Sequence, residues 1–437
     1  MQFVLPYRTK ISSAKSFPQN AVRVFLLVKG KRSLKVDFNI TEDQQHWRDL
    51  AKGFVEKHIK PDVLRRDRLL TAEERIPWDW IREADTAGIR TLGIPKEYGG
   101  AEVDIVTLCI VGEELAVGDL GFAVIMDQCW KMAHLFGEAM TTDQQERFIP
   151  PFVKDPEATT AIALTEPGVG SDHQGYYDQP DIDFTTTAVL DGDYYVLNGT
   201  KRYISNGSMA KLYFVVARTD KTKNLFDGGA VFIVPHDTDG FIADTFHEKS
   251  SQRLATNGIL NFQNCRVPKE NILLGEGKLG QLRSQFMPGS KAEAAATVLG
   301  VGRAAYEYAF DYAKNRKQGG KQIIELQTVA IMLAHIAMKL DAARLQIWKA
   351  GWLADQKHPT APVHGLLAKV NASETAFEAC RVASEVLGGA SIMHEHPVEK
   401  YLRDATSFLH SDGTNQLCLL RASKAISADS YDQVFGF

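Results

Sequence analysis

Asp412 stands in a segment, from Asp404 to Gln416, that combines acidic, hydroxyl and amide side chains within a few residues. A carboxylate can act as a general base when a substrate proton comes within hydrogen-bond reach. The composition Asp412-Gly413-Thr414-Asn415, taken alone, favours a turn or a helix cap instead. The segment therefore offers either a catalytic carboxylate or a structural turn.

A second segment that could form a functional site lies far upstream. It is Thr165-Glu166-Pro167-Gly168-Val169-Gly170-Ser171-Asp172. Its glycines and small hydroxyl residues would let backbone N–H groups approach a planar ligand without obstruction by side chains. A glycine-rich loop alone is a weak signal. The order of several motifs along the chain carries more information than any one of them.

These two segments, with Leu387-Gly388-Gly389 and Pro397-Val398-Glu399-Lys400 at short distances before Asp404, closely resemble the acyl-CoA dehydrogenase family. Members of that family bind FAD and remove two hydrogens from an acyl thioester. The resemblance runs from about Val36 to about Ser427, nearly the whole chain. It implies a multidomain α+β fold with an N-terminal α-helical domain, a middle β-barrel-like domain and a C-terminal four-helix bundle.

The sequence pattern agrees with this architecture. Residues 41–152 have helical character, whereas 185–190 and 194–197 predict two strands around a tight Asp-Gly-Asp turn. Helical periodicity returns after about Gly275, and an apolar stripe from Val329 to Ile347 predicts bundle packing. We expect the domains at 36–158, 159–272 and 273–437, preceded by a leader or extension at 1–35.

The resemblance implies a set of FAD contacts. Two of them, Tyr203 and Ser205, replace the tryptophan and threonine that are common in the family, and Glu385 replaces its usual glutamine. The Arg316 segment matches one that reaches the cofactor of a neighbouring subunit, so a homotetramer or homodimer is implied. The full implied set is Ile162, Leu164, Thr165, Ser171, Tyr203, Ser205, Arg316, Gln318, Gln327, Glu385, Gly388, Gly389, Thr414 and Gln416.

Most members have a glutamate at the position of Asp412, where it acts as the base. Aspartate is one methylene shorter, which withdraws the carboxylate by about 1 Å, a large error for proton transfer. Ser411 stands where members often have tyrosine and would free space beside it. Together these residues favour a branched, cyclic or otherwise bulky acyl group. The implied substrate contacts are Ser171, Asp127, Arg253, Ser411 and Gly413.

Two other carboxylates are alternative bases. Asp127 matches the floor of the acyl pocket, where members acting on cyclohexane-type thioesters use an aspartate. Glu293 is one residue away from Ala292, the position of the glutamate in some branched-chain and long-chain members. One residue on a helix rotates a side chain by about 100°.

The implied activity is FAD-dependent acyl-CoA dehydrogenation, with electrons passed to an electron-transfer flavoprotein. The alternative is a flavin oxidase that resembles nitroalkane oxidases, which use an aspartate at the position of Asp412, or a desulfinase-like lyase on the same fold. A catalytically silent flavin-binding protein is a third interpretation. Oxygen consumption separates the oxidase from the dehydrogenase.

Composition narrows the class of protein. Apolar content of 44%, charged content of 24% and a net charge of −4 are those of a soluble globular protein and favour neither nucleic acid nor an anionic membrane as partner. No apolar run reaches the roughly 18 residues of a membrane span. The five scattered cysteines show no metal-ligand spacing, so we expect reduced thiols and no metal site.

The first 36 residues carry eight lysines and arginines and no acid. This composition suits a transit peptide, which would place the protein in the mitochondrial matrix. It equally suits a start codon assigned too far upstream, which would favour the cytoplasm.

Overall fold

A computed structural model describes residues 39–171, 184–428 and 431–435. Residues Glu42–Phe437 form one compact unit, and the fold described here is that of this unit. Asp172, the last residue of the glycine-rich motif, lies outside the described residues.

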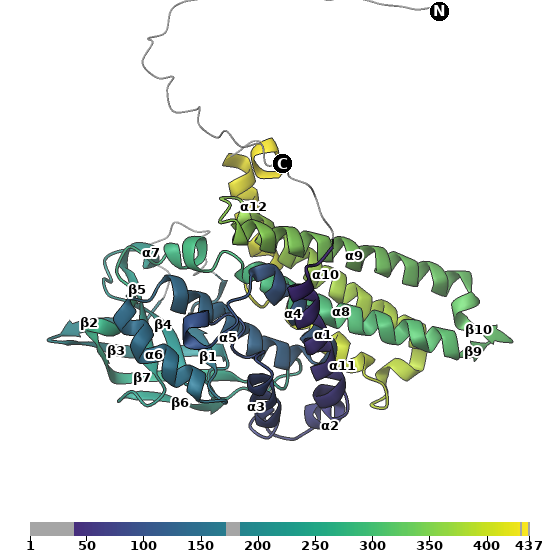
Figure 1. Ribbon diagram of the computed structural model, residues 1–437, viewed down its shortest axis with the longest axis horizontal. Coiled ribbons are helices and arrows are strands. Elements are labelled where there is room, and N and C mark those ends of the chain that lie inside the picture. Colours follow the sequence, from purple (N-terminus) through teal and green to yellow (C-terminus); the bar gives the residue numbers. More distant parts are fainter. Residues whose placement is uncertain (1–38, 172–183, 429–430, 436–437) are drawn as a thin grey trace, which may run out of the picture. The chain divides into compact units, whose positions relative to one another are not determined.

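The first part of the unit is helical (Figure 1). Its helices α4 and α5 are N-capped by Asp104 and Asp119, whose carboxylates accept hydrogen bonds from the backbone N–H groups of Thr107 and Phe122. Helix α5 is apolar on nearly every face, because it packs between α4, α8 and strand β1. The helices are α1 (Glu42–Phe54), α2 (Val63–Asp67), α3 (Trp78–Thr86), α4 (Ile105–Gly118), α5 (Leu120–Glu138) and α6 (Thr142–Lys154).

An eight-stranded sheet follows, with the order β6-β7-β3-β2-β4-β5-β8 and with β1 parallel to β4 off this path. The predicted hairpin is confirmed, since β2 pairs with β3 from Thr187↔Asn198 to Asp191↔Tyr194. The turn contains Gly192 at φ +62°, which glycine adopts without strain. The strands are β1 (Thr160–Ala163), β2 (Thr187–Asp191), β3 (Tyr194–Ser205), β4 (Leu212–Arg218), β5 (Gly229–Pro235), β6 (Phe241–Phe246), β7 (Asn257–Pro268) and β8 (Ile272–Leu274), with the short α7 (Leu225–Gly228) before β5.

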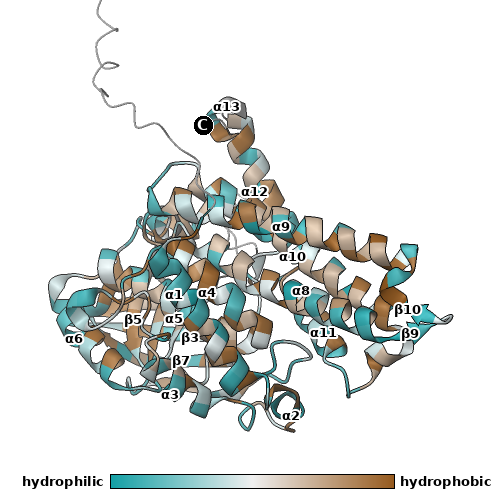
Figure 2. Ribbon diagram, turned by 45° about the vertical axis from the view of Figure 1, so that its right-hand side comes forward, coloured by the Kyte–Doolittle hydropathy of each residue, from teal (hydrophilic) through white to brown (hydrophobic). Residues whose placement is uncertain are grey.

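The last part is a helical bundle that contains the predicted apolar stripe, with Leu333, Ile336, Leu340, Ala343 and Ile347 all buried. Figure 2 shows hydrophobic and hydrophilic residues alternating along α9. The elements are α8 (Ser290–Asn315), β9 (Lys317–Gln318), β10 (Lys321–Gln322), α9 (Gln327–Asp355), α10 (Ala361–Leu387), α11 (Val398–Ser407), α12 (Asn415–Ala428) and α13 (Tyr431–Phe435).

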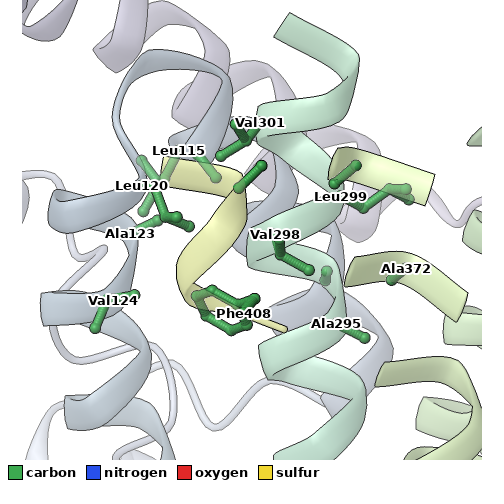
Figure 3. Packing of buried hydrophobic residues seen from close by; sticks show 14 of the residues in the cluster. Leu115, Leu120, Ala123, Val124, Ala295, Val298, Leu299, Val301, Ala372 and Phe408 are labelled. Carbon is green, nitrogen blue, oxygen red and sulfur yellow. The ribbon is translucent and has the colours of Figure 1, made fainter. Parts of the chain in front are cut away.

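Small residues let α8 pack closely against its neighbours. A Cβ atom at Gly302 would lie 2.7 Å from the Cα of Ala376 in α10, which is closer than packed side chains allow. Phe408, directly after α11, lies among apolar side chains of α5 and α8 such as Val124 and Val298 (Figure 3). This packing fixes the end of α11, and with it the turn that carries Asp412.

The five cysteines are buried and free, as expected of reduced thiols. Within the described ranges there is no helix long and apolar enough to cross a membrane.

Candidate functional site

A cavity of about 610 Å³ lies where β1, β3, α5 and the turn before α12 meet. This volume is in the range of roughly 300–1,000 Å³ that is typical of sites for cofactors and small ligands. Ten of the residues singled out in the sequence line it: Asp127, Ile162, Leu164, Thr165, Ser171, Tyr203, Ser205, Ser411, Asp412 and Gly413.

The side of the cavity that is formed by the glycine-rich motif and β3 is held in place by a buried ion pair. Lys201 Nζ lies 2.8 Å from Glu166 Oε1, and neither side chain is exposed. Glu166 also accepts hydrogen bonds from the backbone N–H groups of Thr185 and Thr186. Lys201 donates to the carbonyl of Leu164 at 3.1 Å. The glycine-rich motif is therefore tied to β3 through the side chain of its own glutamate.

This side of the cavity fits a planar ring. Tyr203 is 54% exposed although its side chain is aromatic, and its backbone is held at φ +61°, an uncommon conformation for a bulky residue. Its ring packs on His247, with centroids 4.8 Å apart. The hydroxyl residues Thr165 and Ser205 line the same cavity. An open aromatic face beside hydroxyl and backbone donors matches the apolar rings and polar edge of an isoalloxazine.

Asp412 sits in a turn with left-handed backbone, at φ +56°, followed by Gly413 at φ +91°. Aspartate tolerates this conformation better than most residues. Lys369 holds this turn in place, because its buried ammonium group donates hydrogen bonds to the carbonyl of Gly413 and to Asn415 Oδ1, both at 2.8 Å. The side chain of Asp412 remains 29% exposed at the cavity.

Three ammonium groups surround the Asp412 carboxylate. Lys291 Nζ lies 3.3 Å from Oδ1 and Lys131 Nζ lies 3.6 Å from Oδ2. Burial raises the pKa of Asp412, but the charges of Lys131, Lys291 and Lys369 outweigh it, so the pKa lies well below its ordinary value. Asp412 is therefore ionised over the whole physiological range.

Asp127, one turn before Lys131 on α5, has the opposite electrostatic character. Its Oδ2 lies 2.6 Å from Lys131 Nζ, and both side chains are buried. The pKa of Asp127 is raised to about 7, mainly because burial desolvates the carboxylate. The negative charges of Glu293 and Asp412 add to this effect, and the positive charge of Lys131 opposes it. Its carboxyl group can therefore gain or lose a proton near neutral pH.

Glu293 does not line this cavity. It belongs to the first turn of α8 and is buried, and its Oε1 lies 3.4 Å from His134 Nε2. Arg253 also lies outside the cavity lining, and its guanidinium donates to the carbonyl of Leu69. Thr414 uses its hydroxyl to accept a hydrogen bond from the N–H of Leu417 in the first turn of α12.

The remaining predicted FAD contacts are absent from the lining of this cavity within one chain. Except for Gln416, which is exposed on α12, they lie where α8, α9 and α10 begin or end. They are Arg316, Gln318, Gln327, Glu385, Gly388 and Gly389, and all are exposed.

The three lysines around Asp412 were not anticipated from the sequence. Lys131 carries the one available signal, since it follows Asp127 by four residues inside an otherwise apolar helix. Lys291 and Lys369 look like ordinary surface residues of helices in the sequence. Their role depends on the turn that brings Asp412 between α8 and α10.

Comparison with known proteins gives matches along the chain. The N-terminal, middle and C-terminal domain models of acyl-CoA dehydrogenase match residues 41–155, 161–265 and 282–427. The chain is 30% identical to the mitochondrial isobutyryl-CoA dehydrogenase of Dictyostelium discoideum, over 97% of this chain and 99% of that protein.

Two solved structures illustrate the range of similar folds. Butyryl-CoA dehydrogenase from Megasphaera elsdenii is 32% identical, with a TM-score of 0.83, over 90% of this chain and 100% of that one. The prolyl acyl carrier protein oxidase AnaB is 27% identical, with a TM-score of 0.80, over 89% of this chain and 100% of that one.

Proposed function

This chain belongs to the acyl-CoA dehydrogenase family, and we propose that it desaturates a branched, cyclic or otherwise bulky acyl-CoA thioester between the α- and β-carbons. At the level of the family it is an FAD-dependent acyl-CoA dehydrogenase. The observation that carries the proposal is the Asp412 carboxylate, which is exposed to a cavity that is also lined by Tyr203, Thr165 and Ser205, residues suited to a flavin ring.

A bound FAD would supply the acceptor for the β-hydrogen, which leaves the substrate as hydride. The residues proposed to hold its ring are Ile162, Leu164, Thr165, Tyr203 and Ser205, which line the cavity. The polar residues at the ends of α8, α9 and α10, Arg316 among them, are proposed to meet the cofactor of another subunit, since a guanidinium suits phosphate oxygens.

We propose Asp412 as the base that takes the α-proton. The three neighbouring ammonium groups keep it ionised and ready to accept a proton, but they also make it a weak base. The α-proton of the substrate must therefore be made more acidic. Hydrogen bonds to the thioester oxygen do this, because they stabilise the negative charge that develops there. We propose the backbone N–H of Asp412 as one donor.

Asp127 is the alternative base, because it lines the cavity and its pKa of about 7 suits proton exchange at neutral pH. Glu293 is a weaker alternative, since its side chain is buried and does not line the cavity.

The proposed bulk of the acyl group rests on Ser411 and on the short side chain of Asp412. Ser411 lines the cavity next to the carboxylate, and a hydroxymethyl group leaves room that a tyrosine would fill. A relative that is named for isobutyryl-CoA supports a branched chain. Ser411→Tyr is expected to lower kcat/KM for branched thioesters several-fold more than for straight ones.

The proposed assembly is a homotetramer or homodimer. Four large apolar side chains on α9, Ile331, Met338, Leu345 and Trp352, recur every seven residues and are exposed in one chain. A stripe with this spacing is typical of a helix that packs on another helix. The proposed electron acceptor is an electron-transfer flavoprotein. The proposed compartment is the cytoplasm, or the mitochondrial matrix if residues 1–35 are a transit peptide.

A flavin oxidase, or a lyase of the desulfinase type, is the second candidate. It is favoured by the low pKa of Asp412, because a weak base suits a substrate whose carbon acid is stronger than a thioester. The similar oxidase AnaB demonstrates that the fold is compatible with oxidase chemistry.

Anaerobic titration of the FAD-loaded protein with straight, branched and cyclic acyl-CoA thioesters tests the proposal. Loss of the oxidised flavin absorbance with the bulky thioesters is the expected result. Failure of every thioester, or rapid oxygen consumption during turnover in air, would move the assignment to the second candidate.

A further inference from the structure

Helix α5 carries a polar stripe through an otherwise apolar interior. Asp127, Lys131 and His134 are spaced i, i+4 and i+7, so they lie on one face of the helix. Asp127 and Lys131 line the 610 Å³ cavity. His134 lines a second cavity of about 210 Å³, together with Glu138 and Asp355. The stripe therefore connects two cavities.

Glu293 completes the connection from the neighbouring helix α8. Its side chain is 1% exposed, and its Oε1 lies 3.4 Å from His134 Nε2. It also acts electrostatically on both Asp127 and Lys131. Glu293 therefore lies between the part of the stripe that faces the acyl pocket and the part that faces the second cavity.

The oxygens along this path have unused hydrogen-bonding capacity. Asp127 Oδ1 and Glu293 Oε2 are buried and have no hydrogen-bond partner among residues 39–171, 184–428 and 431–435. Buried polar atoms are nearly always hydrogen-bonded to protein or to ordered water. Two cavities with several convergent polar groups are the setting in which water bridges such atoms.

We propose that Asp127, Glu293 and His134, bridged by water, form a proton path that carries the abstracted α-proton from the acyl pocket to the second cavity. The inference rests on the proposed dehydrogenase function and extends it. Asp412 accepts the α-proton as its O–H bond forms. The proton then passes to Asp127, to Glu293 and to His134, and it leaves to solvent at the second cavity. The first step breaks the C–H bond of the α-carbon, whose electron pair stays on the substrate. Each later step breaks one O–H or N–H bond and forms another, and no electrons move along the path.

The electrostatic environment favours movement in this direction. The pKa of Asp412 is depressed by Lys131, Lys291 and Lys369, whereas the pKa of Asp127 is raised by burial, against the charge of Lys131 and with the help of Glu293 and Asp412. Burial lowers the pKa of His134, but Glu293, Glu138 and Asp355 face it and raise it above its ordinary value overall. The pKa values of Asp127 and His134 are therefore higher than that of Asp412, so a proton on Asp412 is drawn toward them.

A path of this kind has a use in a dehydrogenase. A substrate that fills the acyl pocket excludes water from Asp412, so the proton needs an exit that does not pass the bound product. The second cavity, at the His134 end of the α5 stripe, provides such an exit.

The test follows two signals in one anaerobic stopped-flow experiment on the FAD-loaded protein. Flavin absorbance reports hydride loss, and a pH indicator dye in weakly buffered solution reports proton release. The substrate is the thioester that bleaches the flavin fastest. In the wild type we expect proton release to keep pace with bleaching.

In His134→Gln we expect bleaching to stay within about threefold and proton release to slow by about tenfold or more. In His134→Ala, added imidazole should restore proton release, because the 210 Å³ cavity admits a small ring. His335→Gln is the matched control, since His335 is half exposed on α9 away from both cavities, and both signals should keep wild-type rates.

Proton release that keeps pace with bleaching in both His134→Gln and His134→Ala overturns the path and leaves the dehydrogenase intact. Slow proton release that imidazole does not restore also overturns it, because a structural defect then explains the loss. Absence of bleaching by any thioester in the wild type overturns the proposed function itself, and the path with it.

Discussion

Two buried ion clusters in this molecule have the same composition, one lysine between two aspartates, but different surroundings. In the first, the Lys400 cluster, Lys400 Nζ lies 2.6 Å from Asp119 Oδ2 and 2.5 Å from Asp404 Oδ2. Each aspartate also accepts a backbone N–H at 2.7 Å, from Phe122 and from Gln252. These bonds join the start of α5, helix α11 and the loop before β7, so the cluster has the character of a structural crosslink.

In the second, the Lys131 cluster, Lys131 Nζ lies 2.6 Å from Asp127 Oδ2 and 3.6 Å from Asp412 Oδ2. Here Asp127 Oδ1 has no hydrogen-bond partner in the described part of the chain, and Asp412 faces the cavity. The same arrangement of charges therefore serves different ends: where each carboxylate also accepts a backbone N–H, the cluster holds helices together, and where the carboxylates lie beside the cavity, they can still accept a proton.

The largest expected difference between the clusters lies in catalysis. Asp412→Asn should lower turnover by about 10²–10⁴-fold, the usual contribution of a general base, with the melting temperature nearly unchanged. Asp404→Asn, the matched change in the Lys400 cluster, should lower the melting temperature and leave turnover of the folded fraction within about threefold. Steady-state kinetics and thermal melts of both variants check this. Equal loss of turnover in the two variants would remove the distinction between the clusters.

The next difference lies in stability. Lys400→Met leaves two buried carboxylates without their cation and should lower the free energy of unfolding by about 3–5 kcal/mol. Lys131→Met should cost less, about 1–3 kcal/mol at pH 6, because burial already raises the pKa of Asp127 to about 7 and the carboxyl can take up a proton. Denaturant unfolding at pH 6 measures both values. A larger loss for Lys131→Met would show that its cluster is the more important crosslink.

The smallest difference is a dependence of stability on pH. A carboxyl whose pKa is raised by folding keeps its proton between about pH 4 and pH 7, while the unfolded chain has lost it. Stability that is fully present below pH 4 therefore declines as the pH rises toward 7, at no more than about 1.4 kcal/mol per pH unit. Asp127→Asn should remove this part of the slope. Unfolding curves of the wild type and the variant at pH 5, 6 and 7 isolate it, and parallel slopes would contradict the raised pKa of Asp127.

Much of the fold could be predicted from local patterns. The Asp-Gly-Asp turn between 185–190 and 194–197 and the apolar stripe of α9 each depend on a few neighbouring residues, and both are present in the structure. Asp412 could be singled out because its motif is continuous in sequence.

The charge environment of Asp412 could not be predicted in this way. Lys131, Lys291 and Lys369 come from three helices. Lys131 has a signal in its spacing from Asp127, but the positions of Lys291 and Lys369 are equally compatible with a solvated lysine. Only the packing of α5, α8 and α10 around the turn brings them together. The FAD contacts at Arg316 and Gln327 remain predictions for a related reason, since one chain does not contain the neighbour they are expected to meet.

The base assignment can be tested most directly by the rate of flavin bleaching in a single anaerobic turnover, measured side by side for the FAD-loaded wild type, Asp412→Asn and Asp127→Asn with the best acyl-CoA thioester. We predict that bleaching is nearly abolished in Asp412→Asn and stays within about tenfold of the wild type in Asp127→Asn, the scale of a residue that acts after the proton has been taken. Rapid bleaching in Asp412→Asn, together with its loss in Asp127→Asn, would contradict the assignment and make Asp127 the base.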